Sequence, residues 1–253
     1  MLEFFTSTTF QTVLSALNSG FLKTLQLFFI TLIGALPLGL IISFGSMSRL
    51  APLSRPVHWY LRKNKREPGK IAKLLIAFQP IRLVCRLMVW IIRGTPLVLQ
   101  IIALFYVPGI QKWFNWPSGE TGRMMAVCVA FIINYACYFS EIYRGGIEAV
   151  PKGQTEAGQV LGMTKPQIFF KVTLLQVVKR ILPPMGNEII TLVKDTSLAF
   201  TLSVAEMFSI AKALAASQTN MIPFVVAGLF YYIFNLVVAV GMEWVEKKMD
   251  YYR

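Results

Sequence analysis

Long apolar runs limit what this chain can fold into. The first covers about residues 21–45 and can cross roughly 30 Å of hydrocarbon as a helix. Four further runs follow it. The five expected spans lie at about 21–45, 89–107, 124–143, 187–202 and 222–244. Because one soluble core would have to bury all five, the sequence predicts an all-α integral membrane protein whose residues 1–253 form a single transmembrane domain.

The composition agrees with a membrane environment. Only 15% of the residues are charged, whereas a soluble domain carries about 25%. Cys85, Cys128 and Cys137 are odd in number and lie in apolar stretches, so we expect packing residues and no disulfide framework. The single histidine, His58, has no other metal-ligand residue at the required spacing, and no metal site is expected.

The N-terminal segment does not resemble a secretory signal. Residues 1–19 contain no Lys or Arg, and no small-residue cleavage site follows them. We therefore expect the first span to be retained. Gly34, Pro37 and Gly39 lie inside this span, and membrane helices approach one another closely at such small or kinked positions.

The Lys and Arg residues are distributed unevenly around the spans. If the two basic loops, 48–80 and 144–183, and the C-terminus are cytoplasmic, that side holds about twenty of the 25 Lys and Arg. The positive-inside rule predicts such an asymmetry. We expect the N-terminus to lie outside, and the C-terminus and both loops to lie in the cytoplasm.

The first basic loop, 48–80, has Glu67 as its one acidic residue. Nucleic-acid binding would need a soluble basic domain, whereas spans flank this loop, so retention and attraction to anionic headgroups account for it better. We expect an irregular excursion with no assigned chemistry. Beyond it, Arg82, Arg86 and Arg93 recur at helical spacing, which predicts an interfacial helix with its basic face toward headgroups. The break at residues 94–96 would then turn the chain into the second span.

The segment 144–188 is the longest polar and basic stretch in the apolar second half. Pro151 opens a short helix, and Gly162 can end it in the left-handed conformation of a C-cap. Thr164 can cap a second helix, with Pro166 in its first turn and Gln167 at the capping-box spacing. The pattern predicts a sharp helix-turn-helix.

The spacing of Glu156–Gly158, Gly162 and Val172–Leu174 resembles the cytoplasmic signature loop of permease subunits of binding-protein-dependent ABC importers. The flanking segments resemble more narrowly the polar amino-acid branch of that family, the histidine/arginine/glutamine-like transporters. They are RGTPLVLQ at 93–100, SEIYRGGIEAVPKGQ at 140–154 and KDTSLAF at 194–200. The chain departs from the family at Gly158, where alanine is usual, and at Leu175, where proline is usual. The second departure leaves open where the second helix ends.

The resemblance implies a multi-pass permease of the bacterial cytoplasmic (inner) membrane that pairs with a second, identical or similar chain. The implied partners are cytoplasmic ATPase subunits, which would hold ATP and Mg, an extracellular solute-binding protein, membrane lipid and a polar amino acid as solute. Contact with the ATPase would fall to Glu156, Ala157, Gly158 and Gly162. In that contact Glu156 would bond to donors of the partner, Ala157 and Gly158 would allow close approach, and Gly162 would form the turn.

Polar side chains in and beside the expected spans are candidates to line the path of a solute. They are Gln100, Asn134, Tyr135, Tyr138, Glu141, Asp195, Thr196, Ser197 and Glu206. An ionisable group near the membrane centre costs at least about 2.5 kcal/mol, so Asp195 needs an explanation. Asp195 either pairs with polar groups of the third span or lines the path, and both interpretations stay open here. Glu206 could equally be a solvated charge on the outer side.

The chain contains no sequence that would hydrolyse ATP. Residues 68–70 (PGK) lack the preceding glycine and the following hydroxyl of a phosphate-binding loop, and no nucleophile has an arranged base. We therefore expect no enzyme activity in this chain alone and no cofactor bound to it. Two other function classes remain: a secondary carrier or channel for a small polar solute, with Asp195 as its ion or proton site, and a non-transporting membrane anchor. Flux without ATP would favour the carrier.

Overall fold

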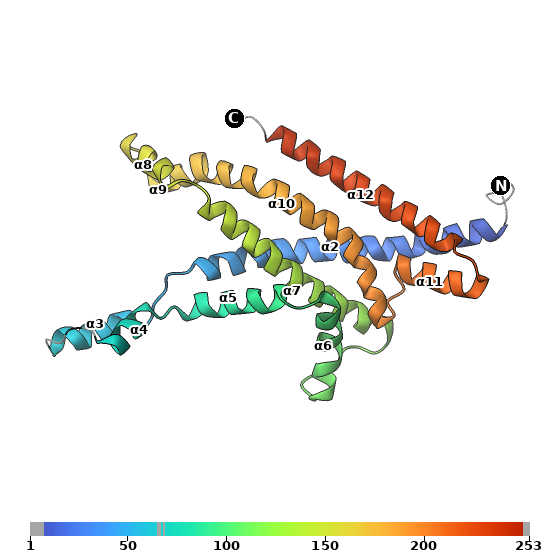
Figure 1. Ribbon diagram of the computed structural model, residues 1–253, viewed down its shortest axis with the longest axis horizontal. Helices are drawn as coiled ribbons and strands as arrows, with labels where there is room; N and C mark the ends of the chain where they lie inside the picture. The colour runs from blue at the N-terminus through green and yellow to red at the C-terminus, as the bar shows by residue number, and fades with distance from the viewer. Residues whose placement is uncertain (1–7, 65–66, 68, 250–253) are drawn as a thin grey trace.

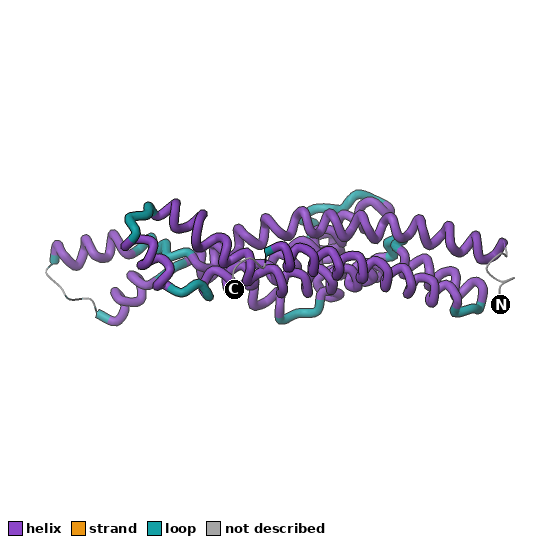
Figure 2. The backbone as a smooth tube through the Cα atoms, turned by 90° about the horizontal axis from the view of Figure 1, so that it is seen from above, coloured by secondary structure: helices purple, strands orange, loops and turns teal. Residues whose placement is uncertain are grey.

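The computed structural model describes residues 8–64, 67 and 69–249, and these form an elongated array of helices (Figure 1). The described part of the chain holds helices and short connections, without a strand (Figure 2). The N-terminal helices are α2 (Thr8–Met47), α3 (Ser54–Lys63), α4 (Lys70–Ala77), α5 (Pro80–Arg93), α6 (Leu97–Ile110) and α7 (Gly119–Glu148). After α7 come α8 (Lys152–Val160), α9 (Lys165–Ile168), η1 (Phe169–Thr173), α10 (Leu174–Asp195), η2 (Thr196–Leu202), α11 (Met207–Gln218) and α12 (Ile222–Lys248).

Three helices, α2, α7 and α12, are each long and apolar enough to cross a membrane. Two bent pairs raise the number to as many as five: α4 with α5, and the helix of residues 165–202 with α11. The all-helical prediction is confirmed. The predicted break at residues 94–96 is confirmed, because α5 ends at Arg93 and α6 starts at Leu97, and the predicted span 89–107 is therefore not one continuous helix. Proline disfavours a helical conformation in the residue before it, so Pro96 accounts for the break.

α7 lies at the centre and packs against α2, α6 and α10. Its inner face consists of buried side chains such as Phe131, Tyr135 and Phe139. Small residues of α2 allow a close approach: a Cβ added to Gly34 would lie 2.7 Å from Ile132 Cδ1. α2 is the neighbour that α7 contacts most extensively, and this explains why so much of α7 is buried.

The second half of the signature segment differs from the prediction. The helix that begins at Lys165 continues through η1, a π-helical stretch, and through α10 and η2 to Leu202. The predictions of a loop up to residue 183 and of a new span from residue 187 are therefore wrong. Leu175 keeps its backbone N–H and so does not interrupt the helix, and Pro183 and Pro184 lie inside α10. Membrane helices tolerate proline because neighbouring groups satisfy the backbone atoms that it leaves free.

One segment that was expected to be irregular is helical, and one helix was not predicted at all. The basic loop 48–80 contains α3 and α4, which pack against each other and extend past the end of α2 (Figure 1). The sequence pattern also did not predict α11. Its N-cap is Glu206, whose carboxylate accepts hydrogen bonds from the backbone N–H groups of Phe208 and Ser209, both at 2.7 Å.

Candidate functional site

The segment 152–168, here named the α8–α9 turn, is a compact motif in which hydrogen bonds between its own residues close the turn between α8 and α9. Gly162 has a φ of +73°, the left-handed conformation that glycine adopts without strain. The N–H of Gly162 donates to Gln159 O at 2.9 Å, and the N–H of Met163 donates to Gly158 O at 3.0 Å. These two bonds form a Schellman motif. The predicted C-cap is confirmed.

A capping box closes the other side of the turn. The backbone N–H of Thr164 donates to Gln167 Oε1 at 2.8 Å, and the side chain of Thr164 accepts from the N–H of Gln167. Pro166 occupies the first turn of α9, as expected. Each of these local features fixes the angle between α8 and α9 through backbone bonds, so the turn keeps its shape without covering its side chains.

The side chains of the α8–α9 turn separate into one internal contact and an exposed surface. Gly158 is buried, and a Cβ added there would lie 2.7 Å from Ile168 Cγ1. Gly158 therefore lets α8 pack on α9 and does not face outward, contrary to the role in partner contact expected for it. Glu156 and Ala157 are exposed. At the tip, Val160 and Leu161 are 87% and 78% exposed, and no described residue covers them.

Two helices join the α8–α9 turn to the centre of the molecule. α7 ends four residues before α8, and α9 continues into α10. α7 and α10 pack closely at Gly146, where an added Cβ would collide with Ile181 Cγ2. Arg180 of α10 also donates to the carbonyl of Ala149 at the end of α7. The turn is thus attached to both α7 and α10, which are themselves in direct contact.

Tyr135 and Asp195 connect α7 and α10 deeper in the molecule. Tyr135 is 2% exposed, and its hydroxyl donates to Asp195 Oδ2 at 2.8 Å. The pairing of Asp195 with a polar group of the third expected span is therefore confirmed. Its place on a solute path remains a prediction, and Asp195 is only partly buried.

A second polar contact joins α7 to the break between α5 and α6. Gln100 Nε2 donates to Ile92 O and to Thr95 Oγ1, both at 2.8 Å. Its Oε1 accepts from Asn134 Nδ2 at 2.9 Å, and Asn134 is buried. Gln100 therefore satisfies backbone groups that the break would otherwise leave free, and it ties that break to α7.

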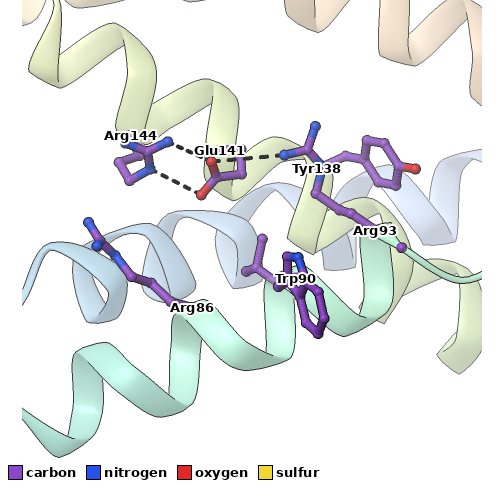
Figure 3. Close-up of a pocket in the computed structure, with 8 residues that line it drawn as sticks. Arg86, Trp90, Arg93, Tyr138, Glu141 and Arg144 are labelled. Carbon is purple, nitrogen blue, oxygen red and sulfur yellow. Dashed lines mark hydrogen bonds and ion pairs between the residues drawn. The ribbon is translucent and has the colours of Figure 1, made fainter.

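A pocket of about 560 Å³ lies between α5 and α7 (Figure 3). Glu141 lies among arginines: Arg144 donates to both of its oxygens, at 3.0 and 2.6 Å, and Arg93 Nη1 lies 3.9 Å from Oε2. The Arg93 guanidinium also lies 5.0 Å from the centre of the Tyr138 ring. Arg86 and Trp90 complete the α5 wall. Arg93 is thus directed at α7, and its expected orientation toward lipid headgroups is wrong.

The remaining candidates from the sequence make hydrogen bonds within the described chain. Thr196 is fully buried and its hydroxyl donates to Val193 O at 2.7 Å, whereas Ser197 donates to Lys194 O at 2.8 Å. Glu206 is fully buried as the cap of α11, and the hydroxyl of Tyr231 donates to it at 3.2 Å. The interpretation of Glu206 as a solvated charge on the outer side is therefore wrong. These three residues do not share a pocket with Glu141.

Sequence reasoning missed several residues of this region. The i,i+3 spacing of Glu141 and Arg144 could have identified their ion pair. Nothing in the sequence predicts that Arg93, separated from Glu141 by two expected elements, approaches the same carboxylate. The same holds for Gly146 against Ile181, because only the crossing of α7 and α10 brings them together.

Comparison with known proteins agrees with this arrangement. Residues 71–251 match the model of the family "Binding-protein-dependent transport system inner membrane component". The L-cystine transport system permease protein of Bacillus subtilis is 35% identical over 178 residues, which cover 69% of this chain and 73% of that protein. A probable amino-acid permease protein of the same organism is 30% identical over 227 residues, covering 88% and 92%. The crystal structure of an amino acid ABC transporter with histidines superposes with a TM-score of 0.74 at 26% identity, covering 94% of this chain and 96% of that one.

Proposed function

The chain belongs to the family of binding-protein-dependent transport system inner membrane components and is a permease subunit of the amino-acid ABC importer type, and we propose that its α8–α9 turn couples it to the ATPase. A separate subunit hydrolyses ATP. The exposed tip formed by Val160 and Leu161 docks in a groove of that subunit, and Glu156 bonds to donors beside the groove. An external binding protein delivers a polar amino acid.

The observation that carries this proposal is the continuity between the exposed turn and the polar contact inside the molecule. α9 continues into α10 without a break, and α10 carries Asp195, which meets Tyr135 of α7. A displacement of the α8–α9 turn therefore reaches Asp195 through helices and close packing. Interfaces of this kind convert a small shift at one site into a change between two packed arrangements. That change would open the solute path alternately to the two sides.

The orientation follows from charge. With the α8–α9 turn and the α3–α4 segment in the cytoplasm, most Lys and Arg residues lie on the inner side. Five spans then place the N-terminus outside. The solute passes the polar contacts of α7, namely Gln100 with Asn134 and Tyr135 with Asp195, in a dimer with a like chain.

The proposal is tested by Gly162→Pro. Proline requires a φ near −65°, whereas Gly162 has +73°, and the substitution also removes the N–H that donates to Gln159 O. We expect ATPase activity stimulated by the solute-loaded binding protein to fall by about tenfold or more, the equivalent of losing roughly 1.4 kcal/mol of coupling contact. Glu156→Arg should act in the same direction without altering the backbone.

Gly153→Ala is the matched control, because Gly153 is a second glycine of the same segment, in α8, and an added Cβ there meets no atom within 4 Å. Its stimulated ATPase activity should equal that of the unsubstituted chain. Membrane insertion and yield of all variants are measured in parallel. Full stimulation in an inserted Gly162→Pro variant, or solute flux that persists without ATP, would contradict the proposal.

A further inference from the structure

A second pocket, of about 540 Å³, lies where α2 ends and α5 begins. Its wall includes Arg49 and Leu50 from the connection after α2, Ser54 and Arg55 from the start of α3, and Ile81 from the start of α5. Arg49 follows the last residue of α2, Met47, by two positions. The pocket therefore lies at the end of the first helix that is long and apolar enough to cross a membrane.

The two arginines of this pocket, Arg49 and Arg55, have no counter-charge in the described chain. Neither makes an ion pair or a hydrogen bond with a described residue, and both are exposed. The connection between them is fixed locally, because the hydroxyl of Ser54 donates to Ala51 O at 2.7 Å and its N–H donates to the same oxygen at 3.0 Å. Two guanidinium groups held on one concave surface suit a phosphate, whose oxygens accept their bidentate hydrogen bonds.

The apolar part of the same surface indicates what kind of phosphate is bound. Leu50 is 65% exposed and Ile81 is 46% exposed, and both lie beside the arginines in the pocket wall. A free inorganic anion would gain nothing from these side chains. A phospholipid would place its headgroup on the arginines and the start of its acyl chains against the leucine and isoleucine, which removes apolar surface from water.

We propose that this pocket binds the headgroup of an anionic phospholipid of the cytoplasmic leaflet, with Arg49 and Arg55 holding the phosphate. In the proposed orientation the anionic cytoplasmic leaflet lies next to the end of α2, and basic pockets between membrane helices on the cytoplasmic side suit such headgroups. The inference uses the proposed orientation but not the identity of the solute. Both arginines precede residues 71–251, the part of the chain that the family model covers.

The neighbouring helices allow a local site to be separated from general basicity. α3 and α4 carry further basic residues, and Lys63 lies 5.1 Å from the centre of the Trp59 ring. Lys70 and Lys73 are exposed on α4, and they are absent from the pocket wall. Removing these two charges changes the net charge of the segment by the same amount as removing Arg49 and Arg55, but leaves the pocket intact.

The test is native mass spectrometry of the purified chain, with any subunits that accompany it, titrated with phosphatidylglycerol and with phosphatidylcholine of the same acyl chains. We expect one phosphatidylglycerol to bind in preference to phosphatidylcholine. Arg49→Gln/Arg55→Gln should weaken that binding by about thirtyfold, because two guanidinium contacts with the phosphate, each contributing about 1 kcal/mol, are lost. Arg49→Lys/Arg55→Lys should retain part of the preference, since it keeps the charge and loses the planar fork.

The control is Lys70→Gln/Lys73→Gln, which should keep the affinity of the unsubstituted chain within about threefold. Equal losses in the two double variants would mean diffuse electrostatic attraction and would overturn the pocket. Equal binding of the two lipids would overturn the headgroup assignment.

Inorganic phosphate at the same concentration is added as a competitor: it should leave the lipid bound, and full displacement would assign the site to a free anion instead. The stimulated ATPase activity of Arg49→Gln/Arg55→Gln in phosphatidylcholine should equal that of the unsubstituted chain. That result would separate a loss of lipid binding from a loss of the proposed coupling.

Discussion

The α7–α10 contact and the α8–α9 turn are adjacent regions, because α8 follows α7 and α9 continues into α10. They differ in whether their side chains have partners within the chain. In the α7–α10 contact, Tyr135 meets Asp195 and Gly146 meets Ile181 within the chain. In the α8–α9 turn the backbone is closed by a Schellman motif and a capping box, but the side chains of Val160 and Leu161 have no described neighbour that covers them.

This difference separates transmission from recognition. A contact whose atoms are matched inside the chain can pass a displacement on, because close-packed side chains do not deform gradually. A rigid turn with uncovered apolar side chains is suited to bind a partner, since its shape is fixed before contact and its buried area is gained only on contact. We therefore expect changes in the first region to alter folding and transport together, and changes in the second to alter coupling with a smaller effect on folding.

The largest effect is expected from Gly146→Leu in the α7–α10 contact. A Cβ already collides with Ile181 Cγ2, so a leucine forces the helices apart. Overpacking of this kind costs about 3 kcal/mol. The thermal midpoint of the detergent-purified chain should fall, and transport in proteoliposomes should drop to background. Ile181→Ala in the same chain provides room and should restore part of both. A double variant no better than Gly146→Leu alone would mean that the α7–α10 contact is not the site of the damage.

Much of this comparison was visible in the sequence, because local chemistry determines the α8–α9 turn. Gly162, Thr164 and Gln167 have fixed positions relative to the helix ends, and the bonds that they form span no more than five residues. The apolar runs likewise predicted an all-helical membrane protein, since the length of an apolar run can be read directly from a continuous stretch of sequence. Pairing of Asp195 with a polar group of the third expected span was one of two interpretations that the sequence left open, and Tyr135 was not singled out as the partner.

What the sequence did not reveal depends on contacts between distant segments or on the continuity of helices. The approach of Arg93 to Glu141 and the burial of Glu206 depend on how helices cross. The predicted loop to residue 183 and span from residue 187 left Pro183 and Pro184 outside a helix, yet α10 runs through them, because membrane surroundings can satisfy the backbone groups that proline leaves free. Gly158 was assigned to partner contact, and its burial against Ile168 depends on the angle of the turn.

The second prediction tests what Asp195 does in the α7–α10 contact. Tyr135→Phe removes the hydroxyl that donates to Asp195, leaving a partly buried carboxylate without that bond. An unsatisfied buried polar group costs about 2 kcal/mol, and we expect this loss in thermal or denaturant unfolding of the purified chain, together with reduced transport.

The double variant Tyr135→Phe/Asp195→Leu removes both partners of that bond, so most of the stability should return. Transport should fall to background if Asp195 lies on the solute path as proposed, because this variant lacks its carboxylate. Transport that returns together with stability would show that Asp195 serves packing alone, and would limit the region to transmission of movement. Ser197→Ala, which removes a hydroxyl that bonds to Lys194 O within its own helix, is the nearby control and should leave both quantities close to the original.

The smallest effect is expected from Thr164→Ala in the α8–α9 turn. It removes one half of the capping box, and such a change costs about 1 kcal/mol of local helix stability. Because the turn lies outside the packed centre, global unfolding should change little. Hydrogen exchange of the backbone N–H of Gln167 should become faster by about fivefold, the equivalent of that 1 kcal/mol. Stimulated ATPase activity should fall less than in Gly162→Pro, since the Schellman motif on the other side of the turn remains.

Thr164→Ser keeps the capping oxygen and should behave as the original chain. If Thr164→Ala lowered the global unfolding temperature as much as Tyr135→Phe does, the α8–α9 turn would belong to the folding core, and the separation between a transmitting contact and a recognition turn would not hold.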